Sequence, residues 1–116
     1  MTDPTASKLA TKITFEWNGT EYTMEFDRDT VAQTEKVFDV SMAEVNAGKI
    51  TAMTGLFYGS FLKHHPNIKA STLDAILNLM PDKVKLFRTL TAMYIVCVNS
   101  LLEDSDEGKT ISWTAV

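Results

Sequence analysis

Cysteine and histidine are scarce in this sequence of 116 residues. The single cysteine, Cys97, excludes a disulfide within the chain and any metal site that needs two thiolates. The two histidines, His64 and His65, are neighbours, and on a helix they would point about 100° apart, so they could not bind one metal ion together. We therefore expect no catalytic residue, no metal and no cofactor, and we interpret the histidine pair as a polar helix end.

Basic residues and long apolar runs are also few. The chain has 11 Lys and Arg against 15 Asp and Glu, a net charge of −4, whereas a domain that binds phosphates needs the opposite sign. The longest unbroken apolar run covers residues 92–98, and a membrane-spanning helix needs about 20 such residues. The polar residues 1–11 do not resemble a secretory signal. We expect no nucleic-acid partner, no membrane insertion and no secretion.

What remains is the composition of an ordinary folded domain, with 45% hydrophobic residues in a chain long enough for one core. Residues 1–10 show no periodicity, which predicts a flexible N-terminal arm. Residues 11–103 are expected to form a single α+β domain. Residues 104–116 are expected to be an acidic linker and a tail, with 110–114 a candidate for a short C-terminal strand.

Apolar and polar residues alternate over residues 12–26, on both sides of an Asn-Gly pair at 18–19. Asn and Gly tolerate the positive φ angles of a type I′ turn, so the pattern predicts a two-residue hairpin. The predicted cross-strand pairs are Phe15 with Tyr22 and Ile13 with Met24. Two strands alone are marginally stable in water, so the apolar face of this hairpin must be covered by other elements.

After residue 26 the apolar spacing changes to three and four, which is typical of helices. We expect helices at 29–39, from Ser41 to just before Gly48, at 50–65, from Ser71 to Pro81, and at 82–103. Asp27, Asp29 and Thr30 are candidates for the N-cap of the first helix, and Gln33 would complete a capping box with Thr30. Pro66 should end the third helix near His65, and Pro81 is expected to serve as the first residue of the last helix. The predicted fold is α+β, mostly α, with the hairpin packed on a bundle of about four to five helices.

Two helices carry signs of a close partner. Gly55 and Gly59 lie four residues apart on one face, where each costs about 1 kcal/mol relative to Ala, so another backbone should approach there. That backbone belongs either to this chain or to a partner helix. The last helix is apolar over an arc wider than the usual 100° or so. The candidate partner-binding residues on these two helices are Met53, Gly55, Phe57, Tyr58, Gly59, Phe61, Met93 and Tyr94.

The order of two motifs resembles the small tail assembly chaperones of long-tailed (siphovirus-type) phages and Gram-positive prophages. The motifs are YTMEFDRDTV at residues 22–31 and LFYGSFLKHHP at residues 56–66, and the resemblance runs from about Ile13 to Glu103. It implies a non-catalytic viral protein that binds the tape measure protein and keeps it soluble while tail-tube subunits polymerise.

The resemblance also implies that the protein acts in the host bacterial cytoplasm and is not part of the mature virion. Many such chaperones have a longer frameshifted form that recruits the tail tube protein, and this chain would be the short form. Whether the chain is a homo-oligomer stays open at this point.

Three other hypotheses for the function compete with a tail assembly chaperone. A structural virion protein, such as a tail terminator or head–tail connector, would keep an acidic α+β domain but stay in the particle. A small enzyme is disfavoured because no base, nucleophile or metal set converges in the sequence. A helix-turn-helix regulator needs a basic recognition helix, and the basic residues of the last helix, Lys83, Lys85 and Arg88, are too few.

Overall fold

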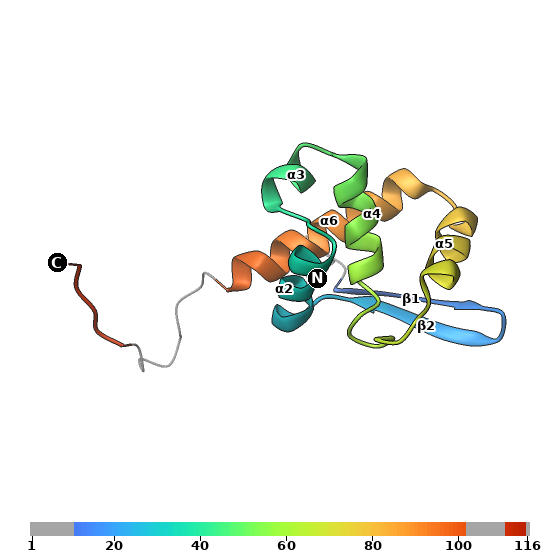
Figure 1. Ribbon diagram of the computed structural model, residues 1–116, viewed down its shortest axis with the longest axis horizontal. Coiled ribbons are helices and arrows are strands. Elements are labelled where there is room, and N and C mark those ends of the chain that lie inside the picture. The colour runs from blue at the N-terminus through green and yellow to red at the C-terminus, as the bar shows by residue number, and fades with distance from the viewer. Residues whose placement is uncertain (1–10, 102–110, 116) are drawn as a thin grey trace, which may run out of the picture.

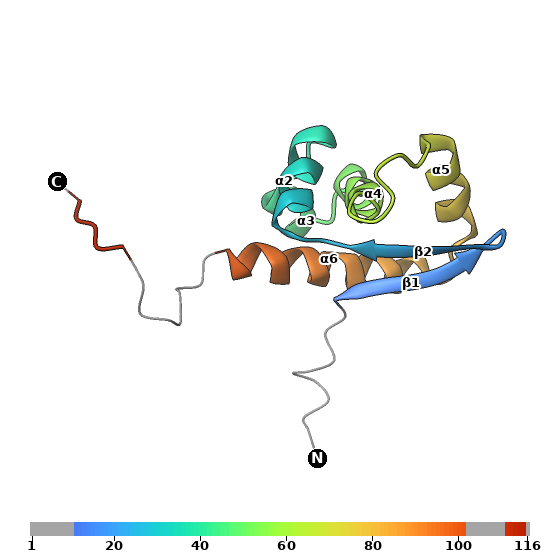
Figure 2. The ribbon, with the colours of Figure 1, turned by 90° about the horizontal axis from the view of Figure 1, so that it is seen from below.

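The described part of the chain forms an N-terminal hairpin and five helices. A computed structural model describes residues 11–101 and 111–115. The elements are β1 (Lys12–Trp17), β2 (Thr20–Glu25), α2 (Arg28–Val37), α3 (Met42–Asn46), α4 (Ile50–Gly59), α5 (Ala70–Leu79) and α6 (Lys83–Ser100) (Figure 1). Figure 2 shows α2, α4 and α5 on one side of a layer that contains the hairpin and α6. The predicted α+β, mostly α architecture is confirmed.

The hairpin has the predicted register. Phe15 lies opposite Tyr22 and Ile13 opposite Met24. Asn18 and Gly19 have φ angles of 53° and 76°, as a type I′ turn requires. The apolar face of the hairpin rests on the aromatic side chain of Phe61, whose ring centroid lies 6.2 Å from those of both Phe15 and Tyr22. The helices thus cover one face of the hairpin, as two strands need in water.

Helices α2 and α4 cross in close contact at the two glycines of α4. A Cβ atom added to Gly59 would lie 2.0 Å from Oγ1 of Thr34, and one added to Gly55 would lie 2.5 Å from Cγ2 of Val40. Thr34 is fully buried in this crossing, where its hydroxyl donates to the Thr30 carbonyl at 2.6 Å. The close approach predicted from the glycines therefore occurs within the chain.

Several helix ends differ from the prediction. At the start of α2 the capping box joins Asp27 and Thr30, each accepting from the backbone N–H of the other at 2.8 Å. The candidate N-cap Asp27 is therefore confirmed, and the Thr30–Gln33 box was wrong. The end of α4 was also misplaced. The helix stops at Gly59 because the following turn tightens, with the Phe61 N–H donating to the Tyr58 carbonyl and the Ser60 hydroxyl to the Phe57 carbonyl.

The last two helices begin at other residues than expected. Helix α5 begins at Ala70 with Lys69 as its N-cap, one residue before the predicted start. Helix α6 begins at Lys83 because Asp82 is its N-cap, with a side chain that accepts from the Lys85 N–H, so Pro81 lies outside the helix.

The short helix α3 begins as expected after Ser41, whose hydroxyl accepts from the Glu44 N–H.

Helix α6 contributes only part of its wide apolar arc to the core. Leu90, Met93 and Tyr94 are buried, and the Tyr94 hydroxyl donates to Glu35 of α2 at 2.5 Å. Other apolar residues of α6 remain open to solvent, with Val84 68% exposed and smaller fractions at Val96 and Leu101. The single chain therefore leaves apolar surface on this helix uncovered.

Residues 111–115 have no regular secondary structure, so the expected C-terminal strand is not formed there, and the described sheet has two strands. Ile111 and Trp113 in this segment are 86% and 82% exposed. The expected N-terminal arm at 1–10 and residues 104–110 of the expected acidic linker and tail lie outside the described residues.

The turn that follows α4 is fastened to β2 by its histidines. The N–H of Thr23 donates to Nε2 of His65 at 3.0 Å, and the N–H of Glu25 donates to the Ser60 carbonyl at 2.8 Å. His64 contacts the Glu25 carboxylate at 2.8 Å, and Lys63 lies 3.5 Å from the same group. The His64 hydrogen bond and the Lys63 charge hold the pKa of Glu25 below its usual value, against the opposing effect of burial. We call these contacts the β2 clasp.

The close crossing at Gly59 gives a first test. The Gly59→Ala substitution would force its Cβ into Thr34, and overpacking of this kind costs about 1–3 kcal/mol. We expect this loss in the free energy of unfolding measured with urea. The double variant Gly59→Ala with Thr34→Ala removes the two nearest atoms but keeps the Thr34 Cβ at 2.7 Å, so it should recover part of the loss as a favourable coupling energy. Strictly additive losses would contradict the crossing.

The β2 clasp predicts that the stability of the fold depends on pH through His65. Burial and the neighbouring His64 charge lower the pKa of His65 below its usual 6.5, and Nε2 can accept from Thr23 only when the ring is neutral. The unfolded chain then binds the proton more readily than the folded chain does. The stabilisation that the His65–Thr23 hydrogen bond gives the fold is therefore present above about pH 6.5 and is lost as the pH falls below it. Urea denaturation between about pH 7.5 and 5.5 should show the loss.

The matched control for this pH test is His65→Gln, which keeps a hydrogen-bond acceptor but does not titrate. Its stability should change less with pH than that of the unmodified chain, because Glu25, Lys63 and His64 are shared by both proteins. Equal pH slopes for the two proteins would show that His65 does not fasten the turn.

Candidate partner-binding groove

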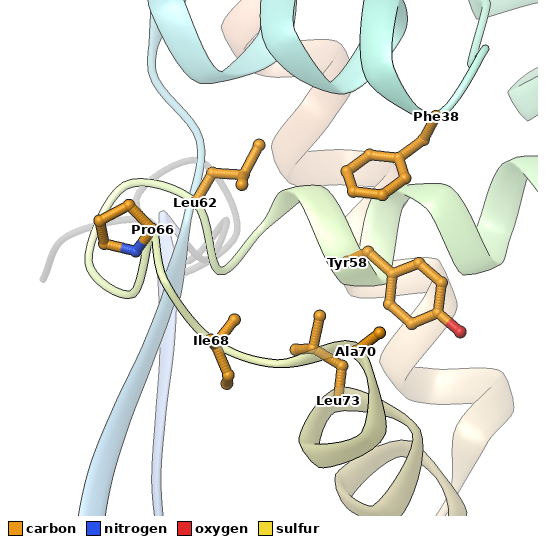
Figure 3. A pocket seen from close by; sticks show the side chains of 7 residues that line it. All are labelled: Phe38, Tyr58, Leu62, Pro66, Ile68, Ala70 and Leu73. Atoms are coloured by element: carbon orange, nitrogen blue, oxygen red, sulfur yellow. The ribbon is translucent and has the colours of Figure 1, made fainter.

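An apolar hollow on the described surface lies between the ends of α2 and α4 and the start of α5. Figure 3 shows its side chains facing one another across the opening. Its volume is about 260 Å³, and it is lined by Phe38, Tyr58, Leu62, Pro66, Ile68, Ala70 and Leu73. We call this hollow the α4–α5 groove.

Two features of the fold set the walls of the groove. The tight α2–α4 crossing brings Phe38, the C-cap of α2, beside Tyr58 near the end of α4, with 5.7 Å between the ring centroids. The opposite wall comes from Leu62 and Pro66, which belong to the turn that the β2 clasp fastens to the hairpin. The groove is therefore formed in the free chain and does not require a partner to shape it.

The start of α5 supplies the floor and the rim. Leu73 is buried at the base of the groove, whereas Ala70 is exposed at its edge. Ile68 approaches from the loop that leads into α5, where its N–H donates to the His65 carbonyl. The groove is thus lined by the loop 62–68, by α4 and α5 and by the C-cap of α2.

Tyr58 carries the one hydroxyl group among the lining side chains, and this group is already engaged. It donates to the Asp74 carboxylate at 2.5 Å. This hydrogen bond, followed by burial, raises the pKa of Tyr58 above its usual 10.0, so the phenol stays a donor and does not act as a base near neutral pH. The lining offers no charged side chain to orient a polar ligand.

The size and lining of the groove favour a protein side chain as its occupant. Small-molecule sites usually have volumes of roughly 300–1,000 Å³ and several polar groups placed to orient the ligand. This groove is smaller, and its one hydroxyl points to Asp74. Apolar side chains from a partner helix need no such polar groups, since burial of their surface supplies the binding energy.

The structure separates the eight candidate residues predicted from the sequence. Met53 and Tyr58 are half-buried and within reach of a partner. The other six are buried in the core or the α2–α4 crossing, so they cannot touch a partner in this conformation: Gly55, Phe57, Gly59, Phe61, Met93 and Tyr94. Of the eight, only Tyr58 lines the groove.

The remaining groove residues were not found from the sequence: Phe38, Leu62, Pro66, Ile68, Ala70 and Leu73. Three of them lie in the loop between α4 and α5, where helical periodicity does not apply. The signal in the sequence was the presence of the apolar residues Leu62 and Ile68 on either side of Pro66, which disfavours helical backbone at the residue before it.

Reactive and metal-binding groups give no competing site in the described part of the chain. Residues 11–101 and 111–115 contain no group of three or more His, Cys, Asp or Glu side chains placed to hold a metal ion. Cys97 is half-buried on α6, and burial is the main cause that raises the pKa of its thiol above the usual 9.0, with Asp27 adding to it. None of the described helices has both the length and the apolar character to cross a membrane.

Comparison with known proteins identifies a family. No curated protein and no solved structure matches the chain. One family model, described as "Domain of unknown function (DUF5055)", matches residues 6–116. This match covers the hairpin, the helices α2–α6 and the segment 111–115. The chain belongs to the DUF5055 family.

Proposed function

We propose that this protein is a non-catalytic phage tail assembly chaperone that binds an amphipathic helix of the tape measure protein. The observation that carries the proposal is the preformed apolar α4–α5 groove, whose only hydroxyl is already bound to Asp74. The sequence resemblance to phage tail assembly chaperones supplies the identity of the partner. The chaperone would act in the host cytoplasm and leave before the tail is complete.

An amphipathic helix fits the groove because its apolar side chains recur every three or four residues. One or two of them would enter the space between Phe38 and Leu62, and the next ones along the helix would lie over Ile68 and Ala70. The groove is small, so its contribution to binding is modest. Modest affinity suits a chaperone that tail-tube subunits must displace.

The Ala70→Glu substitution tests the groove directly. Ala70 is exposed at the rim and is the first residue of α5, where a carboxylate is favourable to the helix dipole. We expect the folded protein to remain stable while the charge blocks the groove. In bacteria that also produce the cognate tape measure protein, the unmodified chain should keep that protein in the soluble fraction, and Ala70→Glu should remove most of this effect.

The matched control is Ser71→Glu, which places the same charge one residue further along α5 and outside the groove lining. It should solubilise the tape measure protein as well as the unmodified chain does. Circular dichroism would confirm that both variants fold. The proposal fails if the tape measure protein is equally insoluble with and without the unmodified chain, or if this protein is found as a stoichiometric component of purified particles.

A further inference from the structure

The two edges of the hairpin differ in what covers them. In a two-residue hairpin Trp17 and Thr20 exchange hydrogen bonds, so the N–H groups of residues 21, 23 and 25 point outward from β2. The β2 clasp occupies two of these, through His65 and the Ser60 carbonyl. The edge of β2 is therefore closed to an additional strand.

The edge of β1 is open. The outward N–H and carbonyl groups of β1 belong to Lys12, Thr14 and Glu16, all exposed, and no residue of the described ranges hydrogen-bonds to them. Figure 2 shows β1 on the outside of the molecule, with β2 between it and the helices above. The apolar residues along this edge, Ile13, Phe15 and Trp17, are half-exposed, while Met24 on β2 is buried. An added strand would therefore gain both backbone hydrogen bonds and apolar contacts.

The chain carries a segment with the properties of such a strand. Residues 111–115, Ile-Ser-Trp-Thr-Ala, combine strong strand formers with no charge that could clash with Lys12 or Glu16. They have no regular secondary structure, and Ile111 and Trp113 are almost fully exposed. Figures 1 and 2 show this segment standing away from the hairpin of its own chain.

We infer that residues 111–115 of a second copy of this chain add as a third strand to the edge of β1, and that the exchange is reciprocal. Ile111 and Trp113 are two residues apart, so both would lie on the apolar face beside Ile13 and Phe15, while Ser112 would lie opposite Thr14 on the polar face. A single chain leaves both the strand and the edge unpaired, and exchange satisfies both.

The interface size is consistent with a specific dimer. Each Trp side chain buries about 150–250 Å² when covered. Reciprocal exchange covers two Trp and two Ile side chains together with two strand edges, which approaches the roughly 1,000 Å² of specific interfaces. Ten residues, 101–110, separate α6 from the segment and reach at most about 35 Å, which is longer than α6 itself at about 27 Å. The segment can therefore reach a neighbouring copy.

Sedimentation of the full chain tests the exchange. We expect a reversible dimer whose dissociation constant rises at least about 100-fold in the Trp113→Asp variant, because two buried Trp side chains are lost per dimer. The matched control is Ile50→Asp, which changes an apolar residue that is 71% exposed at the first position of α4. It should leave the dimer unchanged. A monomer at all concentrations, or a dimer that survives Trp113→Asp, overturns the inference.

Cross-linking identifies the paired strands. Two variants, Thr14→Cys and Ser112→Cys, each with Cys97→Ser, are mixed and oxidised. Opposite residues that exchange hydrogen bonds have Cα atoms about 5.5 Å apart, within the range of a disulfide. We expect mixed dimers to exceed both homodimers. Mainly Thr14–Thr14 cross-links, or an intramolecular disulfide in one chain that carries both cysteines, would show a different pairing and overturn the inference.

Discussion

The contact between Gly59 and Thr34 is the constraint on which the arrangement of this fold depends. Because Gly59 has no Cβ, α2 can lie directly on α4, with the Thr34 side chain filling the space. This approach brings the end of α2 beside the end of α4 and places Phe38 next to Tyr58. It also brings Glu35 of α2 to the Tyr94 hydroxyl on α6. One missing side chain thus sets the positions of three helices and of one wall of the groove.

The second wall of the groove depends on polar contacts. The turn after α4 contains little regular structure of its own, yet it is held at one place because His65 and Ser60 accept from the backbone of β2. The same contacts satisfy N–H groups at a strand edge that would otherwise be open. The β2 clasp therefore shapes the groove and closes one edge of the sheet, and it leaves the other edge for an added strand.

The parts of this structure that follow from local rules could be predicted from the sequence. The Asn-Gly turn sets the hairpin register, and the spacing of Gly55 and Gly59 indicates a close crossing. The end of α4 could not be predicted, because apolar residues continue at helical spacing to Phe61 while the Ser60 hydroxyl and the tight turn end the helix at Gly59. Phe57 and Phe61 were candidates for a partner because periodicity cannot distinguish a buried apolar face from an exposed one. The groove was missed because its walls come from segments far apart in the sequence and from a loop.

Chemical-shift mapping by NMR tests directly whether the α4–α5 groove receives an amphipathic helix. A peptide from a predicted amphipathic helix of the cognate tape measure protein would be added to the full chain with labelled methyl groups. We expect the largest shifts at Leu62, Ile68 and Leu73, which line the groove. Shifts confined to exposed residues elsewhere, such as Val84 and Val96 of α6, or no shifts at all, would contradict this expectation.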